Sequence, residues 1–226
     1  AIYYIDSGRL IFGNGYGLVI YARVNNKVEG LIDLQAICST YYNCDTVKTH
    51  ITVNGNDLVI YNTTGDYSNY GMPDDESGRD TKETAWGYYH IYDLNALPGE
   101  AAFADCKESG EFDTTDCDMY RAGRKYEEEH YLDAWDNVRY LQTSEAADAI
   151  GGDAGSYSEK ACVYTDSEGA GQRCVLLCLS REDDAYTLVE ENIKTGKAVK
   201  NKLETKITSG IRKEVRELCS LPAYKY

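Results

Sequence analysis

The chain has 226 residues, of which 42% are hydrophobic and 12% aromatic, enough for a folded core and too many for a disordered chain. Its formal net charge of −15 argues against nucleic acid as a partner, because contacts to phosphate need a basic surface. No apolar run reaches the roughly 18–20 residues of a membrane-spanning helix, so none is predicted.

The first third of the chain is predicted to be β structure. Residues 1–5 are strand-like, with no initiator Met and no signal peptide before them, which indicates either a processed, mature form or a shortened chain. The segment Phe12–Val24 then contains three alternating glycines, as in a phosphate-binding loop. Such loops lead into a helix or come with further kinase motifs, whereas here a β-branched and aromatic run follows and those motifs are absent. We therefore predict a tight turn between strands at 9–12 and 18–23.

Further turns and strands follow in the region up to residue 92. A turn at 25–27 returns the chain to Val28, and the apolar spacing over 30–37 predicts a short helix. The sequence Asn54-Gly55-Asn56 between two apolar runs is the strongest hairpin signal, and it predicts paired strands at 47–53 and 58–61. A long polar loop at 62–82 and an aromatic strand at 83–92 come next. After a Pro-Gly interruption, residues 101–103 suit a helical turn or two.

The second half of the chain is predicted to contain helices as well as strands. Apolar spacing over 115–142 predicts a helix capped by Thr115 or Asp116, which begins later if Gly123 interrupts it. A hairpin then joins strands at 161–164 and 174–179, a further strand covers 185–189, and apolar residues every four positions from Val199 to Val215 predict C-terminal helices. The expected fold class is α+β, with antiparallel hairpins, a mid-chain helix and a C-terminal helical segment. We expect a β-rich part at 1–112 and an α+β part at 113–226, or one composite domain.

The eight cysteines predict disulfides and therefore an oxidising, extracellular compartment. No pair has the C-x-x-C spacing of a zinc or redox motif, so no metal site is predicted, and we also expect no cofactor. If the turn of the 161–179 hairpin is symmetric, Cys162 lies opposite Cys174, and a direct bridge needs the close Cβ approach of a non-hydrogen-bonded pair. We expect four bridges, with the first four and the last four cysteines linked among themselves: Cys38, Cys44, Cys106, Cys117, Cys162, Cys174, Cys178 and Cys219.

Two further features bear on the cellular setting. Asn62 begins an Asn-Thr-Thr sequon, which predicts N-glycosylation and agrees with secretion. From Lys194 to Tyr226 there are nine Lys or Arg against three Glu, so a basic end follows a strongly acidic body. We expect the two to neutralise each other within the fold, and rank membrane contact through Lys194–Cys219 below that interpretation.

Evidence for catalysis in the sequence is weak. Glu127, Glu129 and His130 lie close together on the predicted helix and are the first residues to consider for a carboxylate-based hydrolase or transferase. The same glutamates, with Arg9 and Ser39-Thr40, loosely match the pieces of ADP-ribosylating toxins, but the middle piece is incomplete. Acidic segments that could bind calcium lack the glycine or the oxygen ligands that such a loop requires.

Tyrosine is the most unusual feature of the composition, with 21 copies against three Phe. Tyr combines a large contact area with a hydroxyl group, which suits recognition of sugars and protein surfaces, although it can also replace Phe in a half-wet core. Tyr67 and Tyr70 lie in the polar loop and are the predicted binding residues. In composition the chain resembles secreted fungal toxins and effectors, so we expect a secreted binding protein that recognises a protein or glycan on a target cell surface or cell wall.

Overall fold

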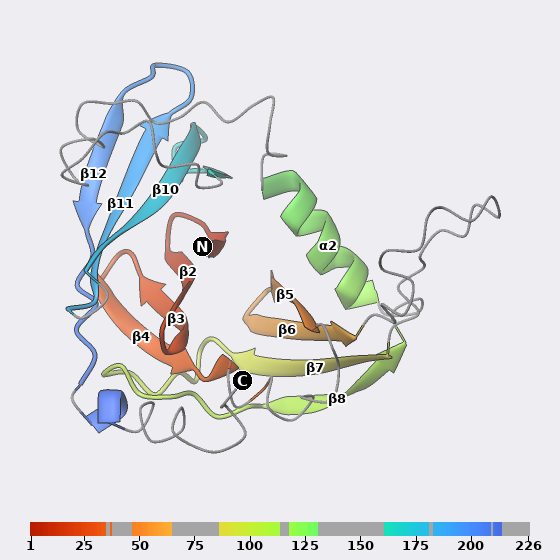
Figure 1. The fold of residues 1–226 in the computed structure, drawn as a ribbon. Coiled ribbons are helices and arrows are strands. Elements are labelled where there is room, and N and C mark those ends of the chain that lie inside the picture. Colours follow the sequence, from red (N-terminus) through yellow and green to blue (C-terminus); the bar gives the residue numbers. More distant parts are fainter. Residues whose placement is uncertain are drawn as a thin grey trace, which may run out of the picture. The chain divides into compact units, whose positions relative to one another are not determined.

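The computed structural model shows a chain composed mostly of antiparallel β-sheet (Figure 1). The residues that it describes are 1–34, 37, 47–64, 86–113, 118–130, 161–180, 183–208 and 210–213. The chain divides into two compact units that are interleaved along the sequence. Unit 1 consists of Ala1–Asp33, Leu97–Ala104 and Glu127–Tyr226, and unit 2 of Leu34–Ala96 and Asp105–Tyr126. The predicted boundary between residues 112 and 113 falls inside unit 2.

Each sheet has four strands that pair in chain order, so every strand is antiparallel to the one before it. This four-stranded meander is the form that a single blade takes in a β-propeller. Unit 1 contains two such sheets: β1 (Ile2–Ile5), β2 (Arg9–Asn14), β3 (Gly17–Ala22) and β4 (Lys27–Ile32), and β9 (Cys162–Thr165), β10 (Gly171–Ser180), β11 (Ala185–Asn192) and β12 (Ala198–Lys202). Unit 2 contains the third: β5 (Val47–Asn54), β6 (Asp57–Thr64), β7 (Trp86–Asp93) and β8 (Glu108–Asp113).

The glycine-rich segment forms the predicted turn between strands. Asn14 pairs with Gly17 across β2 and β3, which leaves a two-residue turn at Gly15 and Tyr16. The Tyr16 N–H donates to Asn14 Oδ1 at 2.8 Å, and Gly17 has a φ of 117°, which favours glycine. The predicted turns at 25–27 and 54–56 are confirmed as well, with positive φ at Asn26 and Gly55.

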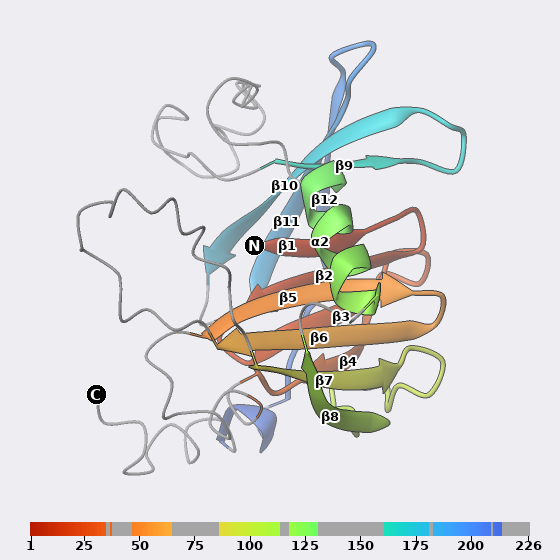
Figure 2. The same cartoon turned by 90° about the vertical axis from the view of Figure 1, so that its right-hand side faces the viewer.

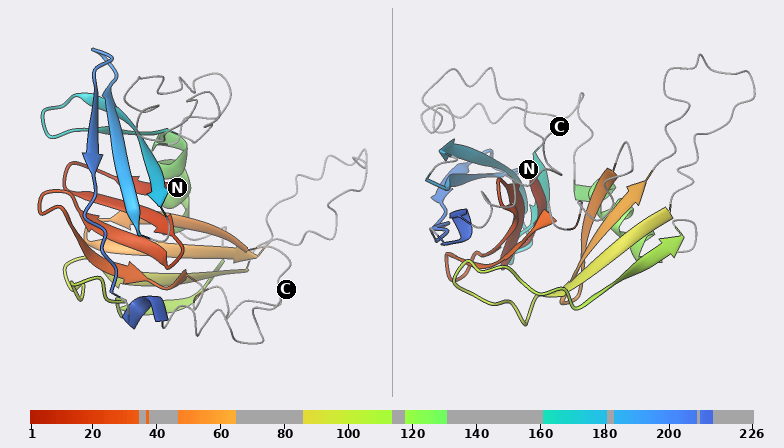
Figure 3. Two further views of the ribbon diagram at one scale, coloured as in Figure 1. Left: turned by 60° about the vertical axis from the view of Figure 1, so that its left-hand side comes forward. Right: turned by 60° about the horizontal axis from the view of Figure 1, so that its bottom comes forward.

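The core of unit 1 lies between its two sheets, whose strands cross each other (Figure 3). Alternate residues of β2 and β3 contribute Leu10, Phe12 and Val19 to this core. From β11, Tyr186 meets Phe12 with ring centroids 5.0 Å apart. Because β3 is buried along its whole length, its continuous apolar sequence fits a strand that is covered on both faces.

In unit 2 the first part of α2 (Asp118–His130) packs on the sheet, where it crosses β5 and β6 (Figure 2). Tyr61 of β6 makes edge contacts with Tyr120 of the helix and with Phe112 of β8. A Cβ atom on Gly123 would lie 3.2 Å from Thr52, so this glycine permits the close approach of helix and sheet. The predicted mid-chain helix is therefore confirmed over 118–130, and Gly123 does not delay its start.

Three local predictions are wrong in whole or in part. The C-terminal apolar spacing was expected to form helices, but residues 198–202 are strand β12 and residues 203–208 are not helical; only the short segment 210–213 is. Leu203 and Ile207 are nevertheless buried, because an extended chain can also direct every fourth side chain inward. The helix predicted over 30–37 does not begin at residue 30, because residues 30–32 complete β4; Leu34 and Ile37 are helical, so this prediction is confirmed only in its second half. At 101–103, Phe103 forms a parallel bridge with Leu31 instead of a helical turn.

The predicted disulfides are not confirmed. The four cysteines among the described residues are all thiols: Cys162 and Cys174 are buried, whereas Cys106 and Cys178 are exposed. Cys38, Cys44, Cys117 and Cys219 lie outside the described residues. Disulfide stabilisation therefore stays a prediction.

Replacing Gly87 by Ala should destabilise unit 2. Gly87 faces Phe112 across β7 and β8, and an added Cβ would lie 2.2 Å from the ring. Tyr61 and Tyr120 hold this ring in place, so Gly87→Ala should lower the free energy of unfolding by about 1–3 kcal/mol, measured by urea denaturation. Gly15→Ala, whose Cβ meets nothing within 4 Å, is the control. Equal stability of the two variants would contradict the packing.

Unit 2 should also lose stability in mild acid. Burial lowers the pKa of His90 on β7, so the fold prefers its neutral form. An unfolded His has a pKa of about 6.5, so the stabilisation is complete above that pH and is lost as the pH falls further. The urea midpoint of the wild type should fall more between pH 7.5 and 5.5 than that of His90→Gln. Identical shifts in the two proteins would contradict the burial of this ring.

Candidate functional site

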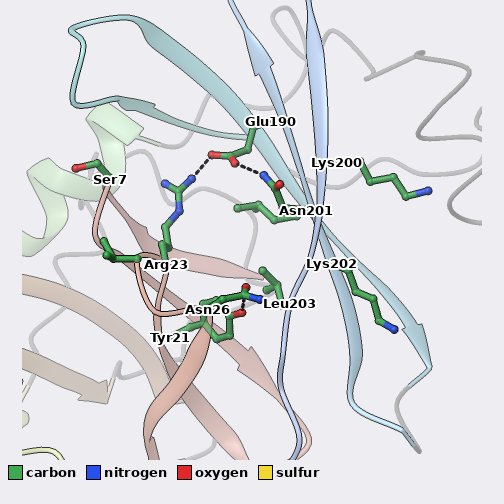
Figure 4. Close-up of a pocket in the computed structure, with 11 residues that line it drawn as sticks. Ser7, Tyr21, Arg23, Asn26, Glu190, Lys200, Asn201, Lys202 and Leu203 are labelled. Carbon is green, nitrogen blue, oxygen red and sulfur yellow. Dashed lines mark hydrogen bonds and ion pairs between the residues drawn. The ribbon is translucent and has the colours of Figure 1, made fainter.

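The best-defined polar pocket among the described residues lies in unit 1, beside the turn between β3 and β4 (Figure 4). Its volume is about 450 Å³, which is within the usual range for a small-ligand site. Its lining combines hydrogen-bonding side chains with one apolar residue of the turn, Val24, which is 82% exposed. The polar lining residues include Tyr21, Arg23, Asn26, Glu190 and Asn201.

Strand β11 places a carboxylate at the floor of this pocket. Tyr186, Leu188 and Glu190 alternate along β11 and share the face that lines the core of unit 1. Tyr186 and Leu188 are apolar core residues at the first two of these positions. The third position, at the end of the row, is a carboxylate, and Glu190 is only 9% exposed. A buried carboxylate requires partners, because its charge has lost most of its contact with water.

Three side chains provide these partners. Arg23 Nη2 lies 2.5 Å from Glu190 Oε1, and the Tyr164 hydroxyl donates to the same oxygen at 2.5 Å. Asn201 Nδ2 donates to Glu190 Oε2 at 2.9 Å. The guanidinium of Arg23 also lies over the Tyr164 ring, 4.9 Å from its centroid. We call Arg23, Tyr164, Glu190 and Asn201 the Glu190 cluster.

The cluster changes the acidity of its members. Burial raises the pKa of Tyr164, and the hydrogen bond to Glu190 raises it further, so the phenol stays protonated and donates. Burial alone would lower the pKa of Arg23, but the Glu190 carboxylate and the Tyr164 hydroxyl together raise it above its ordinary value. The Arg23 guanidinium therefore stays charged at every physiological pH.

Tyr21 shapes the other side of the pocket. Its hydroxyl donates to Asn26 Oδ1 at 2.5 Å and accepts the Glu204 N–H at 2.9 Å. The first bond fixes the β3–β4 turn, and the second fixes the segment that follows β12. Lys200 and Lys202 flank Asn201 on β12 but point away from Arg23 and Glu190 (Figure 4), so their ammonium groups do not add charge to the floor.

A second pocket, of about 350 Å³, lies on the far side of Glu190. Asp166 is its other carboxylate. Its oxygens accept the N–H groups of Ala170 and Glu168 and an amide hydrogen of Gln172, and these bonds lower its pKa. Since Asp166 shapes the β9–β10 turn in this way, it is held as a charged acceptor and is unsuited to donate a proton.

The structure does not gather the sequence-predicted catalytic residues. Glu127 and His130 are half-buried near the end of α2, and Glu129 is exposed. Residues two positions apart on a helix point about 200° apart, so Glu127 and Glu129 do not converge on one ligand. Glu127 and His130, three positions apart, share a side of the helix. The predicted binding residues Tyr67 and Tyr70 lie outside the described residues.

Asn62 does not fit a glycosylation site. It lies on the inner strand β6, is completely buried, and its side-chain oxygen accepts a hydrogen bond from the Thr49 hydroxyl at 2.9 Å. A glycan on this amide has no room in folded unit 2, so the expectation that Asn62 is glycosylated does not agree with the structure.

Protein-family models, curated proteins and solved structures were all compared with the chain, and none of them matches. Within the described residues, no helix is long and apolar enough to cross a membrane. The interpretation of the pocket therefore depends on its own geometry.

Sequence analysis missed both charged residues of the Glu190 cluster. Arg23 follows a strand and precedes an Asn-rich turn, and Glu190 interrupts the apolar face of another strand. A glutamate at an inward position of a predicted strand is a usable signal, since such a carboxylate needs a cation nearby.

Replacing Arg23 by Ala should strongly destabilise unit 1, because it leaves the Glu190 carboxylate buried without its cation. We expect a loss of about 3 kcal/mol in the free energy of unfolding, and a loss of about 1.5 kcal/mol for Tyr164→Phe, which removes one hydrogen bond to the charge. Arg9→Ala is the control, because Arg9 is 3.5 Å from Glu29 and both side chains are about one-quarter exposed, so under about 1 kcal/mol is expected. Equal losses for Arg23→Ala and Arg9→Ala in urea denaturation would contradict the role of the cluster.

Proposed function

We propose that the chain is a secreted, disulfide-stabilised binding protein of toxin or effector type, and that it recognises a glycan or protein on a target cell surface or cell wall. Within this class, the pocket of unit 1 favours a glycan. The supporting observation is the Glu190 cluster, a set of donors and acceptors that is fixed before any ligand arrives. A preformed site loses little conformational entropy when it binds.

The chemistry of the lining matches a ligand rich in hydroxyl groups. Arg23 and Glu190 cancel each other's charge, so the floor attracts neither anions nor cations strongly. Asn26 and Asn201 each carry a side-chain amide, which can both donate and accept hydrogen bonds. Val24 supplies an exposed apolar contact for the less polar face of a sugar ring.

A carboxylate-based hydrolase or transferase was the other expectation from the sequence, and it has less support. Such an enzyme needs two carboxyl groups that face one bond of the substrate. The helix directs Glu127 and Glu129 apart, and Glu190 is neutralised by Arg23. Binding is therefore the function that we propose.

An array of plant, fungal, bacterial and animal oligosaccharides tests this proposal. We expect the wild-type protein to bind at least one glycan, and Asn201→Ala to weaken that binding about 10-fold, the effect of losing one hydrogen bond to the ligand. Asn25→Ala, in the same turn as Asn26 but outside the pocket lining, should bind like the wild type. Circular dichroism confirms that each variant is folded.

Two results would overturn the proposal. If the folded protein binds no glycan on the array, recognition of glycans is wrong. If a glycan binds equally to wild type and Asn201→Ala but is lost in the double variant Tyr67→Ala and Tyr70→Ala, the binding site lies in the segment 62–82 and the pocket is wrong.

A further inference from the structure

Cys162 and Cys174 face each other across two strands of unit 1. The register of β9 and β10 pairs them directly, and both side chains are completely buried. The thiol of Cys174 donates to the Cys162 carbonyl oxygen at 3.2 Å, so its sulfur already lies over the opposite residue.

The turn of the hairpin determines how close the two backbones are. The Gly169 N–H donates to Asp166 O, the Asp166 N–H donates to Ala170 O, and Gly169 has a φ of 82°, which together describe a three-residue loop closed by a bulge. Asp166 and Ala170 therefore form a hydrogen-bonded pair. Because the two pair types alternate along the strands, Cys162 and Cys174, four residues further on, belong to the same type.

The pair is therefore of the wider type, whereas the expectation from the sequence was that a direct bridge needs the closer, non-hydrogen-bonded type. Opposite residues of the wider type have Cα atoms about 5.5 Å apart, which is still inside the range found in disulfides, about 4.4–6.8 Å. The backbone of β9 and β10 therefore permits a bridge between these two residues without a change of register.

We propose that Cys162 and Cys174 are joined by a disulfide in the mature protein. This pairing rests on the secreted setting of the proposed function, where oxidised thiols persist. It forms by exchange with a small disulfide such as oxidised glutathione. One cysteine thiolate attacks the small disulfide and releases one glutathione thiolate, and the second cysteine then attacks the mixed disulfide and releases the other. The new bond joins the two Sγ atoms, both thiol protons leave, and two electrons pass to the glutathione.

In the folded protein the two thiols of the pair differ in acidity. A hydrogen bond from Cys174 lowers the pKa of Cys162. The same hydrogen bond raises the pKa of Cys174, and burial raises it further. Both residues are inaccessible once the sheets have closed, so the exchange takes place during folding.

Cys178, the other described cysteine of unit 1, does not fit as a partner for Cys162. Cys178 lies four residues beyond Cys174, about 13 Å further along β10, where it faces Tyr186 of β11. Strand β9 begins at Cys162 and does not extend that far.

The disulfide would also stabilise the candidate site. Cys162, Cys174 and Glu190 form one row across three neighbouring strands. Tyr164, two residues after Cys162 on the same face of β9, donates to Glu190. A covalent link between β9 and β10 therefore fixes the strand that carries one of the three partners of Glu190.

Peptide mapping under non-reducing conditions tests the pairing. The full chain is refolded in a buffer of reduced and oxidised glutathione, alkylated and digested with trypsin, which separates Cys162 (peptide 161–173) from Cys174 and Cys178 (peptide 174–181). We expect these two peptides to be linked in the wild type and in Cys178→Ser, and not in Cys174→Ser. Alkylated Cys162 in the refolded wild type, a link to any other peptide, or a link that survives Cys174→Ser but not Cys178→Ser would overturn the proposal.

A melting experiment checks that the link stabilises unit 1. Reduction should lower the melting temperature of Cys178→Ser by about 5 °C. The double variant Cys162→Ala and Cys174→Ala should lack that part of the shift; an equal shift in both proteins would contradict the proposed bridge. Neither measurement uses a ligand, so a failed glycan array leaves the pairing intact, and free thiols at these positions leave the pocket intact.

Discussion

The buried pair of Arg23 and Glu190 is the interaction on which the rest of unit 1 depends. A carboxylate on the inward face of β11 would disfavour folding unless a cation reached it, and the cation comes from the turn after β3, 167 residues earlier in the chain. The pair therefore couples the closure of the two sheets of unit 1 to the position of the β3–β4 turn, and Tyr164 and Asn201 add hydrogen bonds to the same carboxylate. The need to compensate the charge of the buried Glu190 carboxylate thus determines both the packing of the sheets and the shape of the pocket.

Local signals in the sequence predicted the hairpins well. The two copies of Leu-Val-Ile-Tyr, at 18–21 and 58–61, both become inner strands, and the Asn and Gly residues between strands take the positive φ values that their turns need. The register of β9 and β10, and with it the opposition of Cys162 and Cys174, followed from the position of the turn. Such features depend on neighbours within about a dozen residues, which is why a single sequence shows them.

Longer-range features could not be predicted in this way. The apolar positions from Val199 onward fit a helix by spacing alone, but pairing with β11 makes the first of them an edge strand, because tertiary contacts override a weak local preference. The interleaving of the two units depends on contacts between distant segments. The candidate site could not be predicted from the sequence for the same reason. Arg23, Tyr164 and Glu190 are far apart in sequence, and none of them belongs to a recognisable motif.

The burial of Asn62 has a practical consequence for producing this protein. The Asn-Thr-Thr sequence is readable by an oligosaccharyltransferase on the nascent chain, before β5, β6 and β7 have paired. A glycan attached at that moment would keep β6 out of the interior of its sheet, so the folded sheet and a glycan on Asn62 exclude each other. Expression in bacteria, which do not attach this glycan, avoids the modification. In a eukaryotic host, Thr64→Ala removes the acceptor sequence and has the same effect.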